Sequence, residues 1–102
     1  MEDRPVVLVF GAGGRLGREF MKMRDERYRF IPYTHYELDI RDFEKVKSEV
    51  LRFKPKRVIN CAAYTNVDDC EGKRFGEGSV PYDVNVLGAI NIARACAEVG
   101  DC

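Results

Sequence analysis

The sequence lacks an excess of charge of either sign, a long apolar run and any tryptophan. Seventeen basic and seventeen acidic residues give a formal net charge of zero, which argues against the basic surface that nucleic acids and acidic membranes attract. The apolar run near the N-terminus, Val6–Phe10, is interrupted at once by glycine and is too short for a signal sequence or a membrane span. We therefore expect neither a nucleic-acid nor a membrane partner.

Histidine and cysteine are too few and too poorly spaced for a metal centre. The chain has a single histidine, His35, and its cysteines form no C-x-x-C pair. The cysteines are Cys61, Cys70, Cys96 and Cys102. We expect no metal ligands, thiols that are free or buried, and a cytoplasmic, reducing location.

What the chain does contain is an alternation of strand-like and helix-like segments. With 102 residues it is about the length of one small domain and has no room for a separate substrate domain. The pattern predicts strands over 6–10, 28–32 and 57–61, and helices over 14–23, 43–53 and 81–99. This alternation is typical of an α/β fold with a parallel sheet and flanking helices. Right-handed crossovers then give the strand order 2-1-3.

Two segments carry more specific structural expectations. The helix predicted over 81–99 has little purely polar surface, so we expect it to be buried on more than one side. The segment 68–80 is rich in glycine, particularly over 72–79, and we interpret it as a mobile loop.

The heptapeptide GAGGRLG, residues 11–17, follows the first strand directly and opens the first helix. Gly11, Gly14 and Gly17 fit the spacing G-x-x-G-x-x-G. In such a turn the first glycine allows the sharp bend, the second lets the backbone approach a pyrophosphate, and the third allows close packing of helix on sheet. The N-terminus of the helix then presents N–H groups to the phosphates. This context favours dinucleotide binding over a purely structural turn.

A second segment leads to the same edge of the predicted sheet. Ligands of open parallel sheets bind beyond the carboxyl ends of the strands, where the strand order reverses. The segment CAAYT follows the third strand and emerges there beside GAGGRLG. Its small residues Ala62 and Ala63 would let a flat cofactor lie close to the backbone.

Four stretches together resemble a known family in their order and spacing: GAGGRLG, ELDIRDFEKV, KPKRVINCAAYTNVD and YDVNVLGAINIARACAEVG. They resemble the N-terminal half of the extended short-chain dehydrogenases/reductases, and most closely the dTDP-4-dehydrorhamnose reductase family. The resemblance implies a Rossmann-like NAD(P)-binding domain over residues 1–102. It also implies an NAD(P)H-dependent nucleotide-sugar 4-ketoreductase, with a nucleotide cofactor and, in the full-length protein, a nucleotide-sugar substrate as partners.

The resemblance further implies roles for individual residues, all at the cofactor. The pyrophosphate turn would comprise Gly11, Gly13, Gly14, Arg15, Leu16 and Gly17. The remaining contacts would be Asp39 and Ile40 at the adenine, Cys61, Ala62 and Ala63 beneath the cofactor, and Tyr64 and Thr65 at the ribose and nicotinamide. Asn85 would support the site from the helix predicted over 81–99. An ordinary packed aromatic remains the alternative for Tyr64, and a simple helix hydrogen bond the alternative for Asn85.

The sequence leaves both NADP and NAD open as the cofactor. An acidic residue about twenty positions past the glycines can hold the ribose 2′-OH and select NAD, and Asp39 resembles that residue. However, the second predicted strand ends near residues 33–35, where there is no carboxylate to repel a 2′-phosphate, so we assign Asp39 to the adenine. Arg15 and His35 could supply positive charge to that phosphate or simply face solvent. On balance we favour NADP.

The chain also departs from the family. Reduction in this superfamily uses a Tyr-x-x-x-Lys pair, and no tyrosine here is followed by lysine at that spacing, so we assign no catalytic residue. We expect a part of a longer reductase, with Val58 and Ile59 on an open sheet edge. The loop over 71–85 is about four residues longer than in the family.

Two further hypotheses remain open. One is a regulatory subunit similar to the family member that modulates methionine adenosyltransferase, and the other is an interaction module without affinity for NAD(P). We leave the oligomeric state open and allow for a homo-oligomer.

Overall fold

The computed structural model describes residues 3–62, 83–100 and 102. Its elements in chain order are β1 (Val6–Phe10), α1 (Arg15–Lys22), β2 (Arg29–Tyr33), α2 (Phe43–Phe53), β3 (Arg57–Asn60), the π-helical segment η1 (Asp83–Gly88) and α5 (Ala89–Val99). The segment predicted as a mobile loop, with Gly72 to Ser79, lies outside the described residues.

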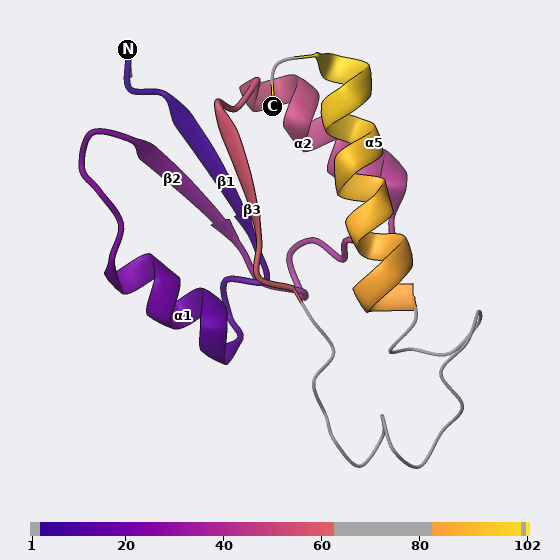
Figure 1. The fold of residues 1–102 in the computed structure, drawn as a ribbon, viewed down its shortest axis with the longest axis horizontal. Coiled ribbons are helices and arrows are strands. Elements are labelled where there is room, and N and C mark those ends of the chain that lie inside the picture. Colours follow the sequence, from indigo (N-terminus) through magenta and orange to yellow (C-terminus); the bar gives the residue numbers. More distant parts are fainter. Residues whose placement is uncertain (1–2, 63–82, 101) are drawn as a thin grey trace.

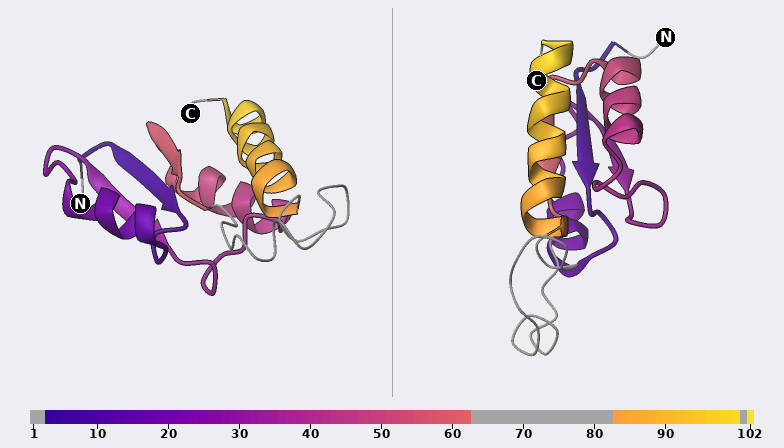
Figure 2. Two further views of the ribbon diagram at one scale, coloured as in Figure 1. Left: turned by 60° about the horizontal axis from the view of Figure 1, so that its bottom comes forward. Right: turned by 90° about the vertical axis from the view of Figure 1, so that its right-hand side faces the viewer.

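The three strands form one parallel sheet in the order β2-β1-β3, as predicted. Helix α1 lies on one face of this sheet, and α2 with α5 lies on the other (Figures 1 and 2). Phe10 is in register with both Tyr33 and Asn60, so the three strands end level with one another. This common edge places the segments that leave the strands side by side.

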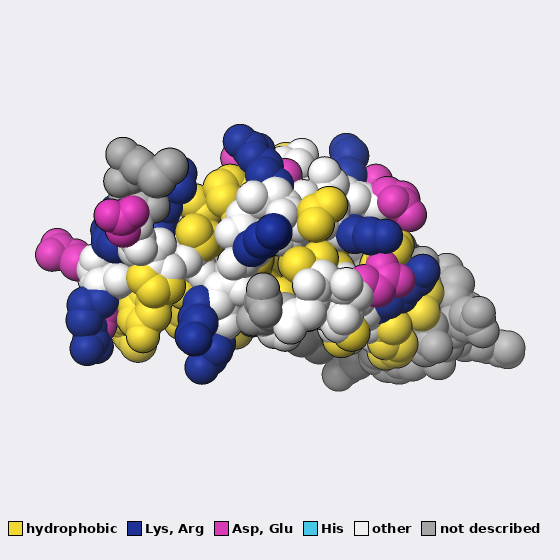
Figure 3. All heavy atoms as spheres, turned by 90° about the horizontal axis from the view of Figure 1, so that it is seen from above, with side chains coloured by type: hydrophobic (Ala, Val, Ile, Leu, Met, Phe, Trp, Pro, Cys, Tyr) yellow, Lys and Arg dark blue, Asp and Glu magenta, His cyan; other side chains and the backbone are white. Residues whose placement is uncertain are grey.

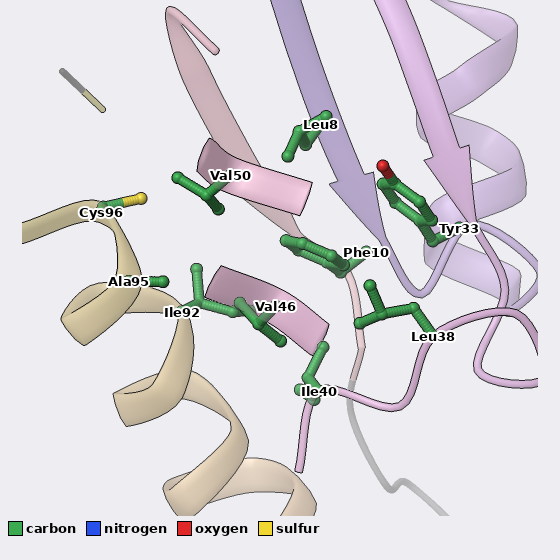
Figure 4. Close-up of a cluster of buried hydrophobic side chains, with 10 residues drawn as sticks. All are labelled: Leu8, Phe10, Tyr33, Leu38, Ile40, Val46, Val50, Ile92, Ala95 and Cys96. Carbon is green, nitrogen blue, oxygen red and sulfur yellow. The ribbon is translucent and has the colours of Figure 1, made fainter. Parts of the chain in front are cut away.

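Strand β1 divides the core into two clusters because its side chains alternate between the two faces of the sheet. Leu8 and Phe10 are fully buried toward α2 and α5, whereas Val7 and Val9 are buried toward α1. This explains why β1 is apolar throughout, as expected for a central parallel strand with helices on both sides. Figure 4 shows the larger cluster, whose buried members are Leu8, Phe10, Tyr33, Leu38, Ile40, Val46, Val50, Ile92, Ala95 and Cys96.

The helix ends follow local sequence signals. Helix α2 spans the predicted 43–53, and its N-cap Asp42 accepts a hydrogen bond from the Lys45 backbone N–H at 3.3 Å. It ends where Lys54 takes a left-handed conformation before Pro55. Helix α5 ends at Gly100, which has φ of 101° and so favours a residue without Cβ.

The C-terminal helix corrects two expectations. In place of one helix over 81–99, the structure has the wider π-helical turn of η1 over 83–88 and then α5. The expectation of burial on more than one side is wrong, because Ile90 is 54% exposed and Leu87 is 37% exposed. Helix α5 packs on α2 through one stripe only, so within the described residues its other face has no helix or strand against it.

Smaller corrections concern the other elements. Strand β2 begins and ends one residue later than predicted, β3 ends at Asn60, and α1 begins after Gly14, which is its N-cap. Among the described residues β3 pairs with β1 alone, so Val58 and Ile59 lie half-buried on an edge strand as expected. Figure 3 shows basic and acidic side chains interspersed over one face. None of the described helices is long and apolar enough to cross a membrane.

Candidate nucleotide-binding site

The glycine turn is joined to both neighbouring strands where β1 ends. The Ala12 N–H donates to the Tyr33 carbonyl oxygen at 2.9 Å, and the Cys61 N–H donates to the Phe10 carbonyl oxygen at 2.8 Å. The first bond extends the contact between β1 and β2 beyond the end of β1, and the second extends the contact between β1 and β3 by one residue beyond β3. The exits of β1, β2 and β3 therefore form one fixed surface at the carboxyl edge, where the sequence predicted the site (Figure 1).

Two of the turn's glycines are required by the packing of the protein itself. Gly11 has φ of +75°, and a Cβ on it would lie 2.4 Å from the Ala62 backbone nitrogen. A Cβ on Gly17 would lie 2.1 Å from the Gly11 carbonyl oxygen and 2.6 Å from Ala12 Cα. Because these neighbours are backbone atoms, neither side chain could be accommodated by a rotamer change. Gly11 and Gly17 bring β3 and α1 against the turn.

The other two glycines are not constrained in this way. A Cβ on Gly13 would meet the end of the Thr34 side chain at 2.9 Å, whereas a Cβ on Gly14 would meet only the Gly11 carbonyl oxygen, at 3.6 Å. Gly14 is the N-cap of α1, it has no side chain to cap the first turn, and that turn contains no acidic residue. Among the described residues, no side chain therefore caps the positive end of α1, and a Cβ at Gly14 would make an ordinary contact.

The two residues after Gly14 are on the surface. Arg15 and Leu16 are both exposed, Leu16 by 65%. They stand in the first turn of α1, beside the position that an anion at Gly14 would occupy. Arg15 adds positive charge there, and Leu16 offers an apolar side chain that the core does not use.

The turn after β2 places a carboxylate, that of Glu37, near the end of the strand. The Thr34 N–H donates to Glu37 Oε1 at 2.9 Å, and the Glu37 N–H donates to Thr34 Oγ1 at 3.3 Å. This is the reciprocal pattern of a capping box. Glu37 thus corrects the expectation that no carboxylate lies near the end of β2. Between the two residues, His35 and Tyr36 are exposed and stack with ring centroids 3.9 Å apart.

The loop between β2 and α2 holds the two residues predicted at the adenine. Asp39 accepts hydrogen bonds from two guanidinium nitrogens of Arg41, of which Nη2 is 2.6 Å from Oδ2 and Nε is shared between the two carboxylate oxygens, and it also accepts one from the Arg41 backbone N–H at 3.0 Å. These hydrogen bonds hold the pKa of the Asp39 carboxyl below its usual range. The Ile40 side chain is buried in the core (Figure 4). Asp39 is therefore a charged carboxylate on an anchored loop.

The exit of β3 is shaped by a side chain as well as by the sheet. Asn60 Oδ1 accepts from the Ala62 N–H at 2.9 Å, which fixes the backbone under the turn. Cys61 is half-buried, and burial raises the pKa of its thiol, so it is a neutral packing group. Ala62 is also half-buried, against Gly11.

The remaining predicted residues are Ala63, Tyr64, Thr65 and Asn85. The first three lie outside the described residues. Asn85 lies in η1, where its side chain is exposed. No cluster of possible metal ligands occurs in the described part of the chain.

Sequence reasoning missed three residues that shape this edge. The predicted third strand includes Asn60 as an ordinary strand residue, although Asn at a strand end is a turn signal. The helix predicted over 81–99 includes Gly88 and Asn91 without a separate role. The signal for these two is their spacing of three, which places a residue without a side chain and an amide on one helix face.

A mainly apolar hollow of about 290 Å³ lies on the α1 face of the sheet, and it is lined by residues that include Phe20, Met23, Tyr28 and Ile59. None of the predicted site residues lines this hollow.

Comparison with known proteins identifies the family. Residues 5–102 match the model of a family described as the RmlD substrate binding domain. The chain belongs to this family. Curated relatives include the dTDP-4-dehydrorhamnose reductase of Streptomyces griseus, 40% identical over 98 residues, and that of Aggregatibacter actinomycetemcomitans, 42% identical over 91 residues. These matches cover 95% and 87% of this chain, but only 31% and 30% of the relatives.

A solved structure supports both the family and the fold. The dTDP-4-dehydrorhamnose reductase of Bacillus anthracis, in complex with NADP, matches 98% of this chain with 34% identity and a TM-score of 0.85. The matched part is 35% of that chain. The Rossmann-like architecture predicted from the sequence is thereby confirmed, and this chain spans about a third of the length of its RmlD relatives.

Proposed function

We propose that this chain is the cofactor-binding part of an NADPH-dependent nucleotide-sugar 4-ketoreductase similar to the dTDP-4-dehydrorhamnose reductases. The observation that carries this proposal is the contrast within the glycine turn. Backbone atoms exclude a side chain at Gly11 and Gly17, whereas among the described residues a Cβ at Gly14, the N-cap of α1, would meet its nearest atom at an ordinary 3.6 Å. That is the arrangement a pyrophosphate requires. Relatives of the chain named as such reductases support the choice of reaction.

The described residues fit a dinucleotide without rearrangement of the core. The pyrophosphate would lie over Gly14, with Gly13, Arg15 and Leu16 beside it. The adenine would lie against Asp39 and the backbone of Ile40, and the backbone at Cys61 and Ala62 would form the floor. Ala63, Tyr64 and Thr65 would continue toward the ribose and nicotinamide, and Asn85 would support the site from η1. Residues 1–102 would then be part of one nucleotide-binding domain.

The choice of NADP over NAD rests on charge near the end of β2. His35 is exposed just after β2 and Arg15 is exposed in the first turn of α1, and in this proposal both contact the 2′-phosphate. Glu37 opposes this, but its carboxylate is engaged with the Thr34 N–H. The B. anthracis relative that holds NADP adds support. We therefore propose NADP as the preferred cofactor.

The chemistry follows from this placement. When bound, NADPH supplies a hydride to the C4 carbonyl carbon of a nucleotide-linked 4-keto sugar. The described residues would hold the pyrophosphate and the adenine, and so would fix the position of the cofactor. We assign the proton donor to none of them, since their part is binding and orientation.

The test is a titration of the purified chain with NADPH and NADH, followed by fluorescence, for wild type, Gly14→Asp and Gly14→Ser. Asp and Ser are both good N-cap residues, so each variant should fold as stably as wild type or gain a few tenths of a kcal/mol. Both add a side chain that competes for the N–H groups of the first turn, but only Asp places a negative charge where the pyrophosphate should lie. We expect NADPH to bind wild type more tightly than NADH does, Gly14→Ser to weaken binding in part, and Gly14→Asp to lose it.

Three outcomes would contradict the proposal. One is a folded wild-type chain that binds neither nucleotide, as an interaction module would. Another is Gly14→Asp binding as tightly as wild type. A stronger affinity for NADH would contradict the choice of NADP alone.

A further inference from the structure

The loop that carries Asp39 is held from two directions. Within the loop, the Asp42 N–H donates to the Asp39 carbonyl oxygen at 2.9 Å. From α5, the side-chain nitrogen Nδ2 of Asn91 donates to the carbonyl oxygens of Ile40, at 3.0 Å, and Arg41, at 3.1 Å. These last bonds join residues 51 and 50 positions apart in the sequence. Thus α5 fixes the backbone of the loop between β2 and α2. These hydrogen bonds are separate from the packing of α5 on α2.

The amide of Asn91 can take only one orientation here. Both partners are carbonyl oxygens, which accept hydrogen bonds and cannot donate them, so Nδ2 must face them. Asn91 is half-buried, and the Ile40 end of this interaction is partly buried too. Loss of the amide would leave two carbonyl groups without this donor.

Gly88, about one helical turn before Asn91, allows the helix to lie close to the loop. A Cβ on Gly88 would lie 2.5 Å from Ile40 Cδ1 and 2.6 Å from Cγ1. Gly88 and Asn91 are three residues apart, so they share one face of the η1–α5 segment. Ile40 is thereby held by two contacts. Its side chain packs against Gly88, and its carbonyl oxygen accepts a hydrogen bond from Asn91. The Asp39 carboxylate is left on the outer side of the loop with Arg41, where its side chain is 39% exposed.

We propose that Asn91 is a positioning residue for the adenine half of the cofactor, and that Gly88 supplies the close approach it needs. This inference rests on the proposed function, because it assigns the Asp39–Ile40 loop to the adenine. Asn91 does not touch the nucleotide. Asn91 sets the position and orientation of the loop backbone relative to the turn at Gly14. It thereby sets the distance between the residues that contact the adenine and those that contact the pyrophosphate.

The decisive variants are Asn91→Asp and Asn91→Ser, with Glu98→Gln as the matched control. Asn91→Asp keeps the shape and replaces the donor by an acceptor that faces two carbonyl oxygens. Asn91→Ser is milder, because its hydroxyl has one proton and a shorter reach. Glu98→Gln weakens a different contact between α5 and α2, the 3.2 Å ion pair with Lys47, near the far end of the helix.

Each variant is titrated with NADPH, with adenosine 2′,5′-bisphosphate and with nicotinamide mononucleotide. We expect Asn91→Asp to weaken the first two about tenfold or more and to leave the third within twofold of wild type. Asn91→Ser should give a smaller loss of the same kind, and Glu98→Gln should change none of the three. Hydrogen exchange of the Arg41 and Asp42 amides should accelerate in Asn91→Asp, while the amides of β1 keep their protection.

The outcomes separate this inference from the proposed function. If wild type binds none of the probes, the proposed function fails, and with it the role given to Asn91. If wild type binds but both Asn91 variants bind adenosine 2′,5′-bisphosphate as wild type does, only the positioning role fails. Equal weakening of all three probes, with faster exchange in β1, would overturn it as well, since Asn91 would then be a stability residue. If Asn91→Asp does not fold, the pattern in Asn91→Ser decides.

Discussion

Replacing Gly17 by alanine should destabilise the fold strongly, even though alanine is the better helix former. The new Cβ would lie 2.1 Å from the Gly11 carbonyl oxygen and 2.6 Å from Ala12 Cα. Both are backbone atoms of the turn, so α1 would have to move outward by roughly 1 Å to reach ordinary contact, as in other overpacked sites. Overpacking typically costs about 1 to 3 kcal/mol and occasionally more, and we take about 3 to 4 kcal/mol here because both close contacts are with backbone atoms. Alanine recovers about 1 kcal/mol of helix propensity.

The net expectation for Gly17→Ala is a loss of about 2 to 3 kcal/mol in the free energy of unfolding. For a domain of this size that lowers the thermal midpoint by about 10 to 20 °C. Urea unfolding followed by far-UV circular dichroism measures it. The control is Gly14→Ala, whose Cβ meets its nearest atom at 3.6 Å and which should lose only about 0.5 to 1 kcal/mol through poorer N-capping. If Gly17→Ala were no less stable than Gly14→Ala, the close packing of α1 on the turn would be refuted.

Three further changes test other parts of the fold. Val46→Ala removes a fully buried side chain and should cost about 2 kcal/mol, measured by urea unfolding. Asp42→Ala removes the N-cap of α2 and should cost about 1 kcal/mol, whereas Asp42→Ser should restore most of it in the same assay. Burial, and next the hydrogen bond to Glu49, raise the pKa of Tyr33, so the unfolded chain releases this proton first and wild-type stability should fall as pH rises above about 10. Tyr33→Phe should flatten that alkaline loss in stability curves measured from pH 8 to 11, and an unchanged slope would contradict it.

The sequence predicted those features that depend on local patterns. The apolar run at β1, the periodic stripe of α2 with its Asp42 cap, and the glycine turn each carry a complete signal, and together they imply the sheet order. What could not be predicted depends on partners distant in the chain. The hydrogen bond between the Glu37 carboxylate and the Thr34 N–H at the end of β2 forms only when the intervening residues make a turn. The role of Asn91 depends on a loop 50 residues earlier in the sequence. The exposure of Ile90 depends on which face of α5 packs against α2.

The reach of Asn91 back to Ile40 also bears on the order in which the chain folds. The β1–β2 ladder pairs residues 23 positions apart, whereas the β1–β3 ladder and the contact of Asn91 with Ile40 join residues 50 and 51 positions apart. Loop-closure entropy therefore favours early pairing of β1 with β2, and it does not separate the other two contacts. The order of synthesis does separate them, because residues 1–62 leave the ribosome before α5 exists. The surface around Asp39 would then reach its final shape only when α5 docks.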